Sequence, residues 1–146
     1  TQRTELVAHH KGQISFPGGA YDWEDKTLQQ TALRETWEEM GIKPNDITIL
    51  GDTDKLLTNT NFLVTPFVGY FSYPYKFRIN SDEIAKIIEV PLKVFINPGN
   101  FEMKVKKING IDINIHYYYY NDNVIWGVTG FLLSNFLSII FNLNHK

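Results

Sequence analysis

Apolar residues recur with a helical spacing in the first third of the chain. Residues 26–40 contain no Gly or Pro and are rich in helix-forming residues, which predicts a helix. Gly41 then supplies a C-terminal stop, and Asp25 or Thr27 can cap the start. The residues available for a buried helix face are Leu28, Ala32 and Met40.

Shorter apolar runs follow the helix and predict strands. Three of these runs lie at residues 47–50, 55–57 and 62–70. Pro66 in the third run indicates an edge strand or a bulge, because proline lacks the N–H that a strand ladder uses. Ser81 and Asp82 precede residues 83–88, a pattern that favours a short capped helix or a turn.

A β-hairpin is predicted further on. Residues 101–108 and 111–120 flank Asn109-Gly110, the strongest short-range signal for a tight hairpin turn. In the second run, alternate residues share one side and predict a half-buried strand face: Ile111, Ile113, Ile115, Tyr117 and Tyr119. The tyrosines at 117–120 are able to stack an adenine, but their alternation favours a place in the core or on the sheet surface.

The last predicted element, residues 124–143, contains no charged residue and is long enough to cross a bilayer. Four polar residues recur there at helical spacing: Ser134, Asn135, Ser138 and Asn142. Such a stripe is typical of a helix packed on a sheet with its polar side in solvent, so we expect no membrane insertion. Trp126 is expected in the core.

Strands mixed with two helices predict an α/β (α+β) fold, a mixed β-sheet sandwiched between helices. The 146 residues fit one domain, residues 1–146, with a composition typical of globular proteins. A net charge of −2 without a basic run argues against a nucleic-acid partner. The absence of cysteine excludes disulfides and thiol chemistry, and it favours a cytoplasmic protein.

The residues that point to chemistry lie between Gly12 and Ile42. The predicted helix carries Glu35, Glu38 and Glu39, which share one face because they are three or four positions apart. Stacked carboxylates repel one another unless a cation lies among them, and all-oxygen ligands favour Mg²⁺ or Mn²⁺. Arg34 lies one turn before Glu38 and is able to reach back to the preceding loop and hold a carboxylate.

Each of these features alone has an ordinary explanation. Glutamates on a helix are usually solvated, and Gly18-Gly19 after Phe16-Pro17 usually forms only a tight turn. Their combination is more specific: Pro-Gly-Gly, a short acidic loop, and then Arg-Glu-x-x-Glu-Glu-x-Gly closing the helix.

This combination resembles the Nudix box: a Gly, five residues, a Glu, seven residues, then Arg-Glu-aliphatic-x-Glu-Glu-x-Gly-aliphatic. The second half is matched in register by Arg34, Glu35, Glu38, Glu39, Gly41 and Ile42. The first half departs from the box, because the segment from Gly19 to Arg34 is one residue longer. Glu24 or Asp25 then stands in for the first Glu, and Thr36 replaces an aliphatic residue.

The flanking residues resemble the coenzyme A diphosphatase branch of Nudix enzymes. The run from Gly12 to Gly19 reads Gly-Gln-Ile-Ser-Phe-Pro-Gly-Gly, as in that branch, and the longer acidic loop is also found there. Thr1-Gln2-Arg3-Thr4 matches the end of the branch's Leu-Leu-Thr-x-Arg-Ser start. The resemblance implies that the first core strand is incomplete in this chain.

The resemblance implies hydrolysis of a nucleoside-linked diphosphate with Mg²⁺ or Mn²⁺. We expect Glu35 and Glu39 as principal metal ligands, and Glu38 as a third ligand or as the general base. Glu83 is the alternative base, although it also reads as an ordinary acidic residue at a helix N-terminus. Arg3 either clamps a phosphate or is a structural surface residue.

Several smaller predictions complete the expected site. Arg34 supports catalysis, and Gly18 and Gly19 contact substrate. The adjacent His9 and His10 are loop residues rather than metal ligands, because neighbouring side chains do not converge on one ion.

The expected substrate is a small nucleotide derivative, coenzyme A or acyl-coenzyme A, cleaved to 3′,5′-ADP and a 4′-phosphopantetheine fragment. An ADP-ribose or dinucleotide pyrophosphatase is the alternative enzyme. A Nudix-fold binding module without catalysis is disfavoured, because all three helix glutamates are present. No membrane or nucleic-acid partner is expected, and a homodimer is left open.

Overall fold

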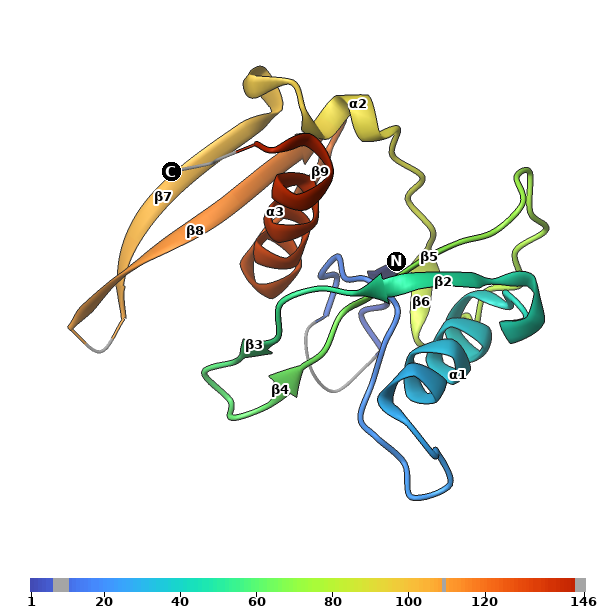
Figure 1. The fold of residues 1–146 in the computed structure, drawn as a ribbon. Coiled ribbons are helices and arrows are strands. Elements are labelled where there is room, and N and C mark those ends of the chain that lie inside the picture. Colours follow the sequence, from blue (N-terminus) through green and yellow to red (C-terminus); the bar gives the residue numbers. More distant parts are fainter. Residues whose placement is uncertain (7–10, 109, 144–146) are drawn as a thin grey trace. The chain divides into compact units, whose positions relative to one another are not determined.

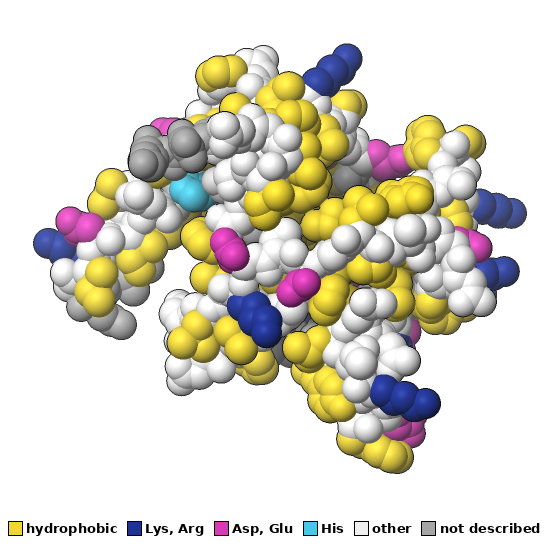
Figure 2. Space-filling view, viewed as in Figure 1, with side chains coloured by type: hydrophobic (Ala, Val, Ile, Leu, Met, Phe, Trp, Pro, Cys, Tyr) yellow, Lys and Arg dark blue, Asp and Glu magenta, His cyan; other side chains and the backbone are white. Residues whose placement is uncertain are grey.

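The computed structural model describes residues 1–6, 11–108 and 110–143, which divide into two compact units, Thr1–Ile88 and Glu89–Lys146 (Figure 1). Each unit is described by itself. In the described residues, no helix combines the length and apolar character needed to cross a membrane. On the face shown in Figure 2, Lys and Arg side chains are scattered and hydrophobic side chains are widely exposed.

The first unit contains the predicted helix, α1, over Leu28–Met40 (Figure 1). It begins two residues later than expected because Thr27 is the N-cap, and its side chain accepts a hydrogen bond from the backbone N–H of Gln30. Gly41 ends the helix in the left-handed conformation at φ 72°, where its N–H donates to the carbonyl of Trp37. The predicted stop is therefore confirmed.

The strands of the first unit form short antiparallel pairs, with β1 before α1 in the sequence and the remaining strands after it. Strand β1 (Gln2–Arg3) pairs with β6 (Ile84–Lys86), β2 (Thr48–Asp52) with β5 (Phe67–Tyr70), and β3 (Leu56–Leu57) with β4 (Leu63–Val64). A 3₁₀ helix over Pro44–Asp46 connects α1 to β2. The run predicted at 62–70 is two strands, because Pro66 interrupts the ladder.

The prediction for residues 83–88 is corrected in part. A turn ends at Glu83, but the following residues form strand β6 rather than a short helix. The reason is tertiary: Ile84, only 1% exposed, pairs with Arg3 on β1, a partner far away in sequence.

The second unit contains the predicted hairpin. Strands β7 (Phe101–Ile108) and β8 (Ile111–Tyr120) pair in register from Phe101↔Tyr118 to Ile108↔Ile111, and β9 (Asn123–Ile125) pairs with the end of β8. A short helix α2 (Leu92–Phe95) and a 3₁₀ turn (Pro98–Asn100) precede the hairpin. The hairpin is confirmed, with Asn109 of its turn outside the described residues.

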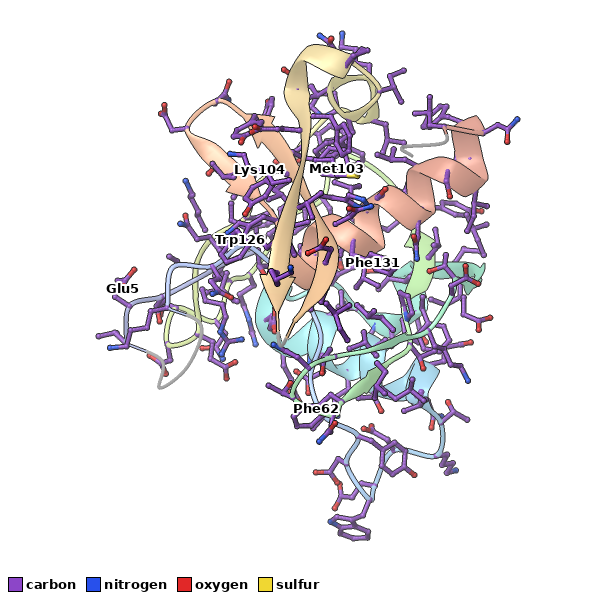
Figure 3. All side chains as sticks on the ribbon, turned by 90° about the vertical axis from the view of Figure 1, so that its left-hand side faces the viewer. Glu5, Phe62, Met103, Lys104, Trp126 and Phe131 are labelled. Carbon is purple, nitrogen blue, oxygen red and sulfur yellow. The ribbon has the colours of Figure 1, made fainter. Side chains whose placement is uncertain are left out.

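The buried side of β8 is the opposite of the predicted one. His116 and Tyr118 are 9% and 0% exposed, whereas Ile111 is 67% exposed. Helix α3 (Gly127–Phe141) packs on the His116 side: the ring of Phe131, labelled in Figure 3, stacks on His116 with centroids 6.1 Å apart. Apolar alternation therefore identified the strand but not the face that the helix covers.

Helix α3 begins after β9, so the predicted last element is a strand followed by a helix. Leu132, Leu133 and Leu137 are buried as expected of the apolar side, but Ser134 of the predicted solvent stripe is only 6% exposed. The core prediction for Trp126, labelled in Figure 3, is wrong, because this residue is 45% exposed. Its ring stacks on Tyr117.

The chain thus has an α/β fold in which all described strand pairs are antiparallel. The segments that carry the predicted site residues all belong to the first unit.

Candidate active site

Helix α1 carries its three glutamates at different depths. Glu39 is 3% exposed, whereas the side chains of Glu35 and Glu38 are 16% and 51% exposed. Gly18 and Gly19 of the loop that leads into the helix lie against this face. The backbone N–H of Gly18 donates to the Glu39 carboxylate. Gly19 lies so close to Glu35 that a β-carbon would overlap the carboxylate, so a larger residue there would require the Glu35 side chain to move.

Arg34 ties the loop to the glutamate face. Its Nη1 donates to Oε1 of Glu35 at 2.8 Å and to Oε2 of Glu38 at 3.0 Å. Its Nη2 donates to Oδ2 of Asp25 at 3.0 Å and to the carbonyl oxygen of Ala20 at 3.2 Å. One planar guanidinium therefore fixes two helix carboxylates and the acidic loop relative to one another.

The loop acid that binds Arg34 is Asp25. Hydrogen bonds from the Arg34 guanidinium, foremost, and from Asp22 N–H and Thr31 lower the pKa of Asp25 to about 2. Glu24, the other candidate for the first Nudix-box acid, is exposed on the turn. Sequence reasoning missed Thr31, whose hydroxyl donates to Asp25 at 2.9 Å. Its position six residues after Asp25, on the covered side of α1, was the available signal.

Glu39 is a buried carboxylate whose negative charge is only partly offset by the hydrogen bonds and positive charges around it. Burial raises the pKa of Glu39, and the nearby charge of Glu35 raises it further. The Gly18 N–H and the positive charge of Arg3 act in the opposite direction, and the net effect is a raised pKa. A bound cation would stabilise both ionised carboxylates.

The donor set fits a divalent metal in its chemistry, since carboxylate oxygens are the ligands that Mg²⁺ and Mn²⁺ prefer. Glu35 and Glu39 lie close enough for their charges to interact. Within residues 1–6, 11–108 and 110–143, however, no group of three or more acidic, histidine or cysteine side chains converges on one metal position. A carboxylate oxygen of Glu38 instead accepts a hydrogen bond from Arg34.

The pairing of β1 with β6 positions the two remaining candidates. Arg3 pairs with Ile84, the residue that follows Glu83. The backbone N–H of Arg3 donates to the carbonyl of Gln13 in the loop. The Nε of Arg3 is buried and has no hydrogen-bond partner among the described residues. Its guanidinium charge acts on Glu39, so it lies on the side of the glutamate face.

Glu83 is brought near Arg3 rather than into the Arg34 network. It is exposed, and its carboxylate makes no ion pair in the part of the chain that the structure describes. Its backbone carbonyl accepts a hydrogen bond from Thr4 N–H. His9 and His10 lie outside the described residues.

Comparison with known proteins identifies the family. The model of the NUDIX domain family matches residues 1–106. A protein of Photorhabdus laumondii named uncharacterized Nudix hydrolase NudL is 34% identical over 133 residues, which cover 91% of this chain and 71% of that protein. The proteins of the same name from Klebsiella pneumoniae strain 342 and Pectobacterium atrosepticum are 34% and 32% identical, covering 88% and 91% of this chain and 67% and 69% of theirs. The chain therefore belongs to the Nudix hydrolases.

Proposed function

We propose that the chain cleaves the diphosphate of coenzyme A or acyl-coenzyme A, with a divalent cation held at the α1 glutamates. Nudix hydrolases act on small nucleotide-derived substrates and generally use divalent metal ions such as Mg²⁺ or Mn²⁺. The observation that carries the cation site is the buried Glu39 beside Glu35 under the Gly18-Gly19 loop. The choice of coenzyme A as substrate is supported by the resemblance of the run from Gly12 to Gly19 to the coenzyme A diphosphatase branch. The charge of buried Glu39 is compensated only in part by its neighbours, and a cation would remove the remaining energetic cost.

Glu35 and Glu39 are the proposed metal ligands, and Glu38 is a third ligand only in the alternative in which Glu83 is the base. When bound, the cation offsets the charge on the phosphate oxygens and lowers the pKa of water beside it. The residues of the chain then hold the substrate and accept the proton of the attacking water. Arg34 binds Glu35 and Glu38 on the helix and Asp25 in the loop, and it thereby holds the loop in place against the glutamates.

Glu38 is the proposed general base. Its carboxylate is half-exposed, so water reaches it, and its contact with Arg34 fixes one of its two oxygens and leaves the other for a proton. Glu83 is the alternative base, favoured by its position next to Ile84, the residue that pairs with Arg3.

Arg3, Gly18 and Gly19 are proposed to bind the phosphates. The buried Nε of Arg3 makes no hydrogen bond with the described residues, which supports a role in binding an anion from outside the chain. Gly19 lets the loop backbone approach Glu35 closely, and the N–H of Gly18 already points at the glutamate face, where it donates to Glu39.

The substrate is tested by comparing kcat/KM for coenzyme A, dephospho-coenzyme A and ADP-ribose with Mg²⁺ and then with Mn²⁺. We expect coenzyme A to be preferred and its products to be 3′,5′-ADP and 4′-phosphopantetheine. A preference for ADP-ribose of about tenfold or more, equivalent to about 1.4 kcal/mol, would move the chain to the alternative branch. If none of these substrates is cleaved with either metal, the chain would be assigned as a Nudix-fold binding module without catalysis.

A further inference from the structure

A recess lies beside the glutamate face, on the flank of α1 that Trp37 occupies. It has a volume of about 420 Å³ and is lined by Trp37, Glu38, Arg78, Ile79, Asn80 and Ser81. All of these residues belong to the first unit. Pockets of several hundred Å³ are of the size that small ligands fill.

The backbone of the far wall is fixed against the end of α1. Arg78 N–H donates to the carbonyl of Met40 at 2.9 Å, and Asn80 N–H donates to the carbonyl of Glu39 at 3.1 Å. Gly41 permits this approach, because a β-carbon there would lie 2.7 Å from Cβ of Arg78. The wall is therefore held at a set distance from the helix.

The Arg78 guanidinium is held over an aromatic ring. Its Cζ lies 5.5 Å from the centroid of the Trp37 ring, within the range of a cation–π contact. No carboxylate pairs with Arg78 in the described ranges of the chain. A guanidinium held over an indole makes no hydrogen bond to the ring, so its N–H groups, whose geometry matches phosphate, are available to a ligand.

The recess also touches the reaction site, because Glu38 lines it and at the same time contacts Arg34. If a substrate with its diphosphate at the glutamate face has its nucleoside end on the Glu38 side, that end reaches Arg78. Asn80 adds a side-chain amide to the wall. The Oδ1 atom of this amide accepts a hydrogen bond from Asp82 N–H, which leaves the side-chain NH₂ group to donate to a ligand.

We propose that this recess is a subsite for a phosphate on the nucleoside end of the substrate, distinct from the diphosphate that is cleaved. Arg78 binds the phosphate, and Trp37 is a positioning residue that holds the guanidinium flat. The inference rests on the proposed function for the direction in which the substrate lies. Arg78 therefore recognises the phosphate on the nucleoside end of the substrate, and not the diphosphate that is cleaved.

The test measures binding of 3′,5′-ADP and 5′-AMP without metal, by calorimetry, so that it needs no turnover. Wild-type protein should bind 3′,5′-ADP the more tightly. Arg78→Gln should weaken 3′,5′-ADP binding about tenfold or more, the scale of a lost hydrogen bond to a charged group, and change 5′-AMP binding less than twofold. Trp37→Leu should weaken 3′,5′-ADP binding by a smaller factor, and Trp37→Phe should restore it in part.

Lys76→Gln is the matched control, since Lys76 is an exposed cation two residues away that does not line the recess. It should leave both affinities unchanged. Arg78→Met also retains the side-chain stem and replaces Arg78→Gln if that variant fails to fold in a thermal scan. Equal affinity of the wild type for the two nucleotides, or unchanged discrimination in a folded Arg78 variant, overturns the subsite.

Failure of the subsite and failure of the proposed function give different results. If coenzyme A is not cleaved but Arg78 still controls 3′,5′-ADP binding, the subsite stands and the assigned reaction falls. If coenzyme A is cleaved and Arg78 variants still prefer 3′,5′-ADP over 5′-AMP as the wild type does, the assigned reaction stands and the phosphate is bound elsewhere.

Discussion

Glu39→Gln replaces a side chain that is 3% exposed with a neutral one of nearly the same shape. Burial, above all, raises the pKa of Glu39, so the folded, metal-free protein holds this proton more tightly than the unfolded chain. The ionised carboxylate therefore destabilises the fold. This cost is absent below the ordinary pKa of 4.5, grows above it, and is complete once the pH exceeds the folded-state pKa.

The magnitude follows from the linkage between protonation and folding. A tenfold difference in proton affinity between folded and unfolded chains is worth about 1.4 kcal/mol. About 1 kcal/mol changes the Tm of a domain in this size range by roughly 2–8 °C. At pH 7 without metal, Glu39→Gln should therefore melt a few degrees above the wild type, and the difference should close below pH 4.5. Saturating Mg²⁺ should raise the Tm of the wild type more than that of the variant.

The assay is thermal unfolding from pH 4 to pH 8, with and without Mg²⁺, together with kcat on the preferred substrate. Turnover should fall on the order of 10²–10³-fold, as when one preorganised electrostatic contact is removed from an active site. Glu38→Gln is the thermal control: its side chain is 51% exposed, so its stability change should stay within about 1 kcal/mol. A metal-free Glu39→Gln that melts below the wild type at pH 7 would refute the electrostatic argument, and near-normal turnover would refute the ligand assignment.

Three further predictions address the base, acid stability and the last helix. Glu38→Gln should lower kcat by more than about 10²-fold at unchanged metal affinity, while Glu83→Gln should be nearly silent; the reverse result would make Glu83 the base. Because hydrogen bonding lowers the pKa of Asp25 to about 2, its contribution to stability is complete above its ordinary pKa of 3.8 and is lost as pH falls toward 2. Asp25→Asn should therefore flatten the acid limb of a Tm–pH curve, and an unaltered limb would contradict this. Leu132→Asp should abolish soluble expression by burying a charge, whereas half-buried Asn135→Leu should be tolerated; equal tolerance of both would mean the α3 face is misassigned.

The sequence by itself was sufficient where the interactions are local. The start and stop of α1 follow from Thr27 and Gly41, whose capping contacts lie within one helical turn. The hairpin follows from Asn109-Gly110 and the strand-forming runs on either side. The shared face of Glu35, Glu38 and Glu39 follows from helical spacing alone, and the reach of Arg34 to the loop was expected from its position.

Only the tertiary structure decided which sides of these elements are covered. His116 and Tyr118, rather than the alternate isoleucines, are buried on β8 because α3 packs against them, and alternation alone is symmetric between the two faces. Residues after Glu83 form a strand because a partner strand from the opposite end of the unit supplies hydrogen bonds.

The same distinction applies to the site. Spacing placed three carboxylates on one helix face, but their depths depend on how the preceding loop folds over α1. Gly18 and Gly19 bring that loop onto Glu39 and Glu35, and burial then raises the pKa of Glu39. The choice of Asp25 over Glu24 also depends on the loop, because hydrogen bonds to Arg34 and Thr31 require a fixed conformation that residue order does not specify.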